Sequence, residues 1–275
     1  MASAYRNFSG CVELCRAHGY GRIEVANLSM VGHCLSYLNR FEESLESSRE
    51  AMIMARRVGH QRAEIIAAAN ALRVLPFLLD ADAANTNVER ILELARQIGA
   101  RRFESEAMVA HAAILALAGR RSEALDLTLR GLEAARETGI QFLGPDLLGQ
   151  LAILTEDDAL RRRSLTEGEE LLCAGSVGHN HLRFHRHAIE GSLNAREWDE
   201  VDRYTQALED YTRPEPLPWG DFWVAWGRAL AAHGRDPKST AAVGNIKRVL
   251  EEAQRIGMRP AIPALRHALC GTDAG

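Results

Sequence analysis

Apolar side chains recur along the chain at helical spacing, and short polar breaks interrupt them about every twenty residues. One apolar segment between two such breaks contains Ala107, Val109, Ala110, Ala113, Ile114 and Leu117. No segment shows the sustained alternation of apolar and polar positions that is typical of a half-buried strand. The pattern therefore predicts an all-α fold with essentially no strand.

A repeat of about forty residues organises this pattern. It is marked by a column of glycines: Gly19, Gly59, Gly99, Gly139, Gly178 and Gly257. An apolar residue stands seven positions before each glycine: Val12, Met52, Leu92, Leu132, Leu171 and Leu250. A small residue stands four positions before each glycine: Cys15, Ala55, Ala95, Ala135, Ala174 and Ala253. Because three columns agree over six copies, we predict that one structural unit recurs along the chain.

Each column has a physical role. The apolar and the small residue lie three apart on one helix face, where the small residue lets a neighbouring helix approach closely. The glycine marks a helix end, because it adopts the left-handed conformation without a steric penalty. With a polar break near its middle, each unit has the pattern of a helical hairpin, and stacked hairpins bury a continuous core. We therefore predict a right-handed α-solenoid with a period of about 40 residues.

The glycines and the polar breaks also predict the boundaries of the units. Residues 1–20 are expected to form the second half of an incomplete leading repeat, and residues 258–275 a C-terminal capping helix and tail. Six units are expected between them: near 21–59, 60–99, 100–139, 140–178, 179–218 and 219–257. Because the leading segment has no room for its first helix, we expect the chain to be part of a longer protein.

The third unit resembles a tetratricopeptide repeat (TPR). Its segments Ala118–Leu125 and Gly131–Arg136 contain a turn glycine, a following Glu-Ala-Leu and a small residue late in the second helix. The usual TPR period is about 34 residues, so a period near 40 implies longer helices or longer turns. HEAT-type repeats, with periods of about 40–47 residues, are the alternative. The Gly-Arg-x-x-Glu-Ala turn favours the TPR resemblance over HEAT.

The second half of the chain resembles the C-terminal region of certain bacterial class III adenylate/guanylate cyclases. The segments Gly178–Arg186, Trp198–Val201 and Ala207–Trp219 carry this resemblance. In such proteins a cyclase domain and a signal-transduction ATPase domain precede a long TPR region, and related ATPase-type transcription regulators have similar repeats. The resemblance implies that this chain is a regulatory tail that contains neither enzyme module. The sequence agrees, because a Walker A loop requires Gly-Lys and no Gly-Lys pair occurs.

Composition narrows the class of protein. The 275 residues are 47% hydrophobic and 25% charged with a net charge of −4, and this lack of a basic excess argues against nucleic-acid binding. No apolar run is long enough for a membrane span, and no signal-peptide core is present, so we expect a cytoplasmic protein. Only two of the 33 basic residues are lysine, which is typical of a high-GC bacterial genome. The five cysteines are expected to be reduced and mostly buried.

A histidine cluster is the strongest chemical signal in the sequence. It comprises His179, His181, His185 and His187, with Arg183 and Arg186 between them. A polar surface or packing role is the favoured interpretation; ligand or anion recognition and metal binding are the alternatives. No Asp, Glu or Cys stands beside the histidines at ligand spacing, and the arginines oppose a cation, so we expect no metal and no other cofactor.

An aromatic segment follows at 214–226, where three prolines end a helix early. Its tryptophans either fill the gap that the shortened helix leaves or anchor a partner at an interface. The candidate contacts for a partner or ligand are accordingly His179, His181, Arg183, His185, Trp219 and Trp223.

These observations predict a non-catalytic TPR-like interaction or sensor module of a bacterial signalling protein, with no catalytic residues. Its partner would be a protein or peptide, including the ATPase or cyclase domains of its own parent chain. We expect it to bind neither nucleic acid nor a membrane. The sequence is compatible with a homodimer. Two alternatives are a helical-repeat receptor for a small-molecule effector and the TPR region of an ATPase-type transcription regulator. A closed apolar cavity favours the receptor, whereas an open polar groove favours the interaction module.

Overall fold

The computed structural model describes residues 1–78 and 80–270. It is 85% helical and has no strand within these ranges, which confirms the predicted all-α class. The α-helices are α1 (Ala2–His18), α2 (Gly21–Tyr37), α3 (Phe41–Arg57), α4 (Gln61–Leu78), α5 (Ala81–Gln97), α6 (Arg102–Leu117), α7 (Arg121–Thr138), α8 (Gly144–Leu154), α9 (Asp158–Cys173), α10 (Gly178–Asn194), α11 (Trp198–Thr212), α12 (Pro218–Arg235), α13 (Thr240–Arg255) and α14 (Ile262–Cys270). Two short 3₁₀ segments are η1 (Ile140–Phe142) and η2 (Arg259–Ala261). Residues 271–275 of the expected C-terminal tail lie outside the described residues.

Most of the glycines in the repeat column end a helix as predicted. Positive φ angles between 63° and 116° occur within two residues of the ends of α1, α3, α5, α7 and α13, at Gly19, Gly59, Gly99, Gly139 and Gly257. This backbone conformation is strained for residues with a Cβ, so glycine is the residue that ends these helices at low cost.

The prediction for the fifth glycine of the column, Gly178, is wrong. Gly178 is the first residue of α10, and the preceding helix α9 already ends at Cys173. The left-handed turn between them is made by Gly175, with a φ of 100°. Ala174, expected to pack inside a helix, is exposed just beyond the end of α9. The physical reason is the short α8, whose hairpin with α9 ends sooner than its neighbours.

The helices form an inner and an outer series. Each helix packs against the next one along the chain, and the even-numbered helices from α2 to α12 also contact one another in succession. We call α2, α4, α6, α8, α10 and α12 the inner helices. The odd-numbered helices from α3 to α13 lie outside them and cover their other faces.

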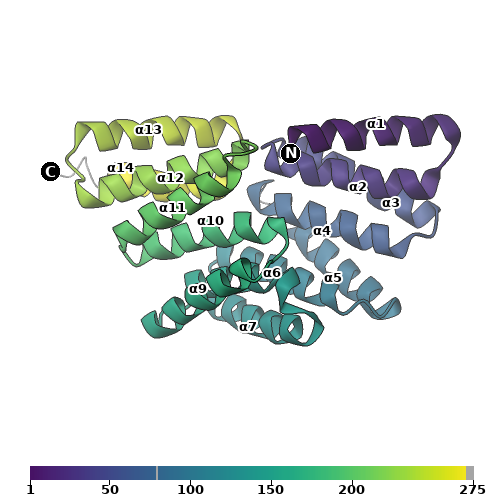
Figure 1. Ribbon diagram of the computed structural model, residues 1–275, viewed down its shortest axis with the longest axis horizontal. Helices are drawn as coiled ribbons and strands as arrows, with labels where there is room; N and C mark the ends of the chain where they lie inside the picture. The colour runs from purple at the N-terminus through teal and green to yellow at the C-terminus, as the bar shows by residue number, and fades with distance from the viewer. Residues whose placement is uncertain (79, 271–275) are drawn as a thin grey trace.

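The first and last inner helices, α2 and α12, lie next to each other, whereas the C-terminus lies farther away, at the outer end of the C-terminal helices (Figure 1). Helix α12 contacts α2, and η2 contacts α4. In this contact zone Arg259 Nη1 donates to the carbonyl oxygen of Leu78 at 3.0 Å, and the N-terminal ammonium group of Met1 pairs with Glu215. The ring of Tyr37 packs edge-on against that of Trp219. We call this zone the seam.

The cysteines are less buried than expected. Cys15 and Cys34 are buried, but Cys11, Cys173 and Cys270 are exposed, which corrects the expectation of mostly buried thiols. Cys11 lies on α1, a helix that packs chiefly against α2 and therefore leaves much of its surface in solvent. The other two exposed cysteines are the last residues of α9 and α14, where helix packing ends.

Candidate functional site

The inner helices line a central cavity of about 370 Å³ that is partly open to solvent. Its wall contains residues from all six inner helices, together with Arg121 at the start of α7 and Pro260 in η2. Small and apolar side chains form much of this wall, including Ala69, Leu72, Phe77, Ala110, Ala113 and Leu117. The alanines on α4 and α6 create the hollow, because their short side chains leave the middle of the ring unfilled.

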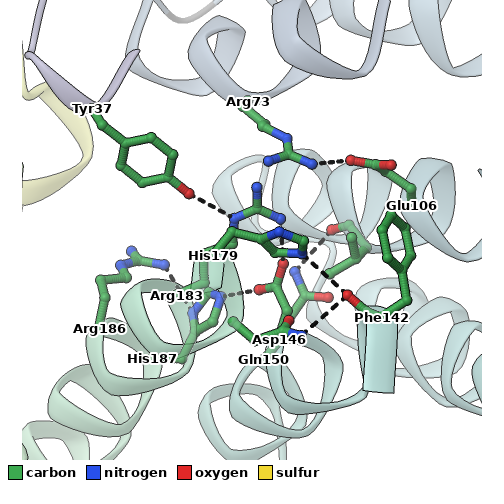
Figure 2. A network of polar contacts seen from close by, with 12 residues as sticks. Tyr37, Arg73, Glu106, Phe142, Asp146, Gln150, His179, Arg183, Arg186 and His187 are labelled. Atoms are coloured by element: carbon green, nitrogen blue, oxygen red, sulfur yellow. Dashed lines mark hydrogen bonds and ion pairs between the residues drawn. The ribbon is translucent and has the colours of Figure 1, made fainter. Parts of the chain in front are cut away.

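Asp146 is the centre of the polar part of the wall (Figure 2). It lies in the first turn of α8 and is 3% exposed. Its Oδ2 atom accepts a hydrogen bond from Nη1 of Arg183 at 2.9 Å, and its Oδ1 atom lies 3.0 Å from Nε2 of His187. Two partners on α10 therefore hold this buried carboxylate in place.

The tautomer of His187 follows from its neighbours. Its Nδ1 atom lies 3.0 Å from Nη1 of Arg186. A guanidinium group can only donate, so Nδ1 accepts and the ring proton is on Nε2, from which it is donated to Asp146. The chain Arg186–His187–Asp146–Arg183 is thus a continuous hydrogen-bonded network along one side of the cavity.

Helices α2, α4 and α6 contribute the polar side chains that face this network: Tyr37, Arg73 and Glu106 (Figure 2). Arg73 on α4 forms an ion pair with Glu106 on α6. The hydroxyl oxygen of Tyr37 accepts a hydrogen bond from Nε of Arg183 at 3.3 Å, and burial raises the pKa of this hydroxyl group well above its usual value. The contact between Tyr37 and Arg183 therefore connects the end of α2 to α10, although three other inner helices lie between α2 and α10 in the chain.

The sequence-predicted site residues lie on α10 and α12, and only some of them border the cavity. Arg183 lines the cavity, and Trp219 lines it from the start of α12. His179 borders the network: its Nε2 atom lies 3.1 Å from the carbonyl oxygen of Phe142, and burial, assisted by the charge of Arg73, lowers its pKa.

The remaining predicted residues lie away from the cavity. The ring of His181 stacks on that of Tyr211, with centroids 4.4 Å apart, and burial lowers its pKa. His185 packs among aromatic rings near α11, where burial lowers its pKa to about 4. Trp223 is 1% exposed and packs against Trp219, Phe222 and Trp226, while the guanidinium carbon of Arg186 lies 4.7 Å from its ring centroid.

Many cavity residues were not among the predicted contacts, including the polar residues Tyr37, Arg73, Glu106, Asp146 and His187. A sequence signal for three of them exists. Arg73, Glu106 and Asp146 are charged residues within largely apolar stretches of α4, α6 and α8, where a charge is costly unless it is paired.

The described residues contain no group of three or more His, Cys, Asp or Glu that is placed to hold a metal ion. Within the same part of the chain, every helix is too short or too polar to cross a membrane.

No protein-family model matches the sequence, and no curated protein matches it.

Proposed function

We propose that this chain is a non-catalytic helical-repeat sensor module that binds a small molecule in the central cavity. The supporting observation is the cavity itself, whose volume of about 370 Å³ lies within the range of about 300–1,000 Å³ typical of small-molecule pockets. Its wall also combines apolar side chains with polar groups held in place by hydrogen bonds, and convergent polar groups of this kind fix the orientation of a ligand in such pockets.

In this proposal the hairpins stack as a right-handed α-solenoid of TPR-like units with a period of about 40 residues. The contacts between successive inner helices support such stacking. An extended peptide groove, the usual site of TPR proteins, is less well supported, because the seam joins α2 to α12 and interrupts the concave surface.

The seam also offers a way to transmit a signal. Tyr37 and Trp219 line the cavity and contact each other, so a ligand that touches both stabilises the form in which α2 and α12 are in contact. The outer helices are then free to bind a protein partner, including the ATPase or cyclase domains that the cyclase resemblance implies.

A small-molecule screen with a cavity-filled variant tests the proposal. Ala113→Phe places a ring in the cavity, whereas Ala241→Phe adds the same ring to an exposed position on α13 and serves as the matched control. A ligand present at about a hundredfold excess over its Kd should raise the Tm of the wild type by about 5 °C or more. The same shift is expected for Ala241→Phe and none for Ala113→Phe. A library in which every binder also binds Ala113→Phe would contradict the proposal.

A further inference from the structure

The cavity wall has more cationic than anionic groups. Four arginines line it, namely Arg73, Arg121, Arg183 and Arg186, against three carboxylates, Glu106, Asp146 and Glu190. Each carboxylate is already paired with one arginine: Glu106 with Arg73, Asp146 with Arg183 at 2.9 Å and Glu190 with Arg186 at 2.6 Å. A ligand therefore meets a wall whose negative charges are neutralised and whose positive charges are in excess.

Arg121 supplies the excess charge. Its Nη2 atom donates a hydrogen bond to the carbonyl oxygen of Ile153 at 2.7 Å, and this neutral acceptor leaves the positive charge of the guanidinium group in place. The side chain lies at the start of α7 and is exposed, which leaves the guanidinium group accessible to a molecule that enters the cavity.

The buried arginines also have N–H donors that remain unused. Arg183 uses Nη1 for Asp146 and Nε for Tyr37, whereas Nη2 is buried without a hydrogen-bond partner among the described residues. Both carboxylate oxygens of Asp146 are occupied, by Arg183 and His187. A buried unpaired donor is costly, and a ligand oxygen that draws this guanidinium group toward the cavity recovers that cost.

The apolar residues follow the polar ones along two of the inner helices. On α6, Val109, Ala113 and Leu117 come after Glu106, and on α8, Ile153 comes after Asp146. Gln150 Nε2 donates to the carbonyl oxygen of Val109 at 3.0 Å, which keeps these two helices side by side at that level. The cavity therefore combines apolar surface on α4, α6 and α8 with arginines on α4, on α10 and at the start of α7, where Arg121 lies beside Ile153.

From this arrangement we infer that the ligand of the proposed sensor is a small amphipathic anion, with one carboxylate or phosphate group at the arginines and an apolar body against α4, α6 and α8. The inference rests on the proposed function, because it specifies the ligand class of the same cavity. Arginine suits this role, since its planar group donates two hydrogen bonds to a single oxyanion.

Four probes that have a similar alkyl chain but different head groups test the ligand class: octanoate, octyl phosphate, 1-octanol and octylamine. Isothermal titration calorimetry on the whole chain measures each Kd. We expect octanoate or octyl phosphate to bind at least about tenfold more tightly than 1-octanol, since charge-assisted hydrogen bonds are lost in the alcohol. Octylamine should bind more weakly than the alcohol. The relative affinities of the two anions distinguish a carboxylate ligand from a phosphate ligand.

Variants connect the preference to the arginines. Arg183→Gln should reduce the affinity for the anion about tenfold or more and leave 1-octanol unaffected, whereas Arg183→Lys retains part of the preference. Because Arg183→Gln leaves Asp146 with one partner and endangers folding, Arg121→Gln is the second variant; it removes the excess charge without isolating a carboxylate. Arg101→Gln, in an exposed pair with Glu137, is the matched control.

The outcomes separate this inference from the proposed function. Equal affinity for octanoate and 1-octanol, with both lost in Ala113→Phe, overturns the anionic class and leaves the cavity as a small-molecule site. The anionic class is also overturned if none of the four probes binds while the library yields a neutral ligand that Ala113→Phe excludes. A library without any ligand sensitive to Ala113→Phe overturns both.

Discussion

The ring of Trp219 meets the ring of Tyr37 edge-on, with centroids 5.5 Å apart, although Trp219 lies in the first turn of α12 and Tyr37 is the last residue of α2. Both side chains are buried and both line the central cavity. The Tyr37 hydroxyl oxygen also accepts from Arg183, which itself pairs with Asp146. This contact therefore connects α2 and α12 to the polar side of the cavity.

A double-mutant cycle measures this contact. Tyr37→Leu and Trp219→Leu should each lower the free energy of unfolding in urea, and together they should lower it by less than the sum. The expected coupling is about 0.5–1.5 kcal/mol, the usual value of an aromatic pair. Tyr37→Leu combined with Trp198→Leu, on α11 against Gly234, should be additive within about 0.5 kcal/mol. Additivity of the Tyr37 and Trp219 changes would show that the seam is not held by these rings.

Gly168 provides a test of the packing between α9 and α10. A Cβ atom at this position would overlap the ring of Phe184, which is fully buried, so Gly168→Ala should reduce the free energy of unfolding by about 1–3 kcal/mol. Gly244 on α13 is exposed and has no heavy atom near the position of an added Cβ. Gly244→Ala should therefore stabilise the protein by about 0.5–1 kcal/mol through helix propensity alone. Equal effects of the two substitutions in urea titrations would contradict the close approach of α9 and α10.

Acid should destabilise the protein through its buried histidines. Burial, with smaller effects of His181 and Arg203, lowers the pKa of His185 to about 4, and burial lowers that of His33 to about 3. An unfolded histidine titrates near about 6.5, so between these values the unfolded chain binds more protons than the folded one. The stability that neutral His185 retains above about pH 6.5 is therefore lost as the pH falls toward 4. The loss is on the order of 3 kcal/mol.

The variant His185→Gln isolates this contribution. Its free energy of unfolding should fall less steeply between pH 6.5 and 4 than that of the wild type, because glutamine does not titrate. His267→Gln, at an exposed position on α14, should follow the wild-type curve. A His185→Gln curve parallel to the wild type would mean that His185 titrates alike in the folded and unfolded chains.

The helices and most of their ends could be predicted from local sequence. These features depend on residues close together in the chain. The spacing of apolar residues predicts each helix, and a glycine such as Gly99 ends it at low steric cost. The error at Gly178 shows where this local information stops. Gly175 and Gly178 lie three residues apart, and the short hairpin of α8 and α9 decided which of them makes the turn.

The set of side chains that share the cavity depends on packing between distant helices. The histidine cluster was visible in the sequence, but the rotation of α10 about its axis directs His187 to Asp146 and His185 to the rings near α11. Tyr37 and Trp219 have no sequence pattern in common. They meet because each inner helix is rotated relative to the one before it, and these rotations together bring α12 next to α2. The angle between two helices depends on side-chain packing at their interface, so the contact between α2 and α12 cannot be predicted from any local sequence pattern.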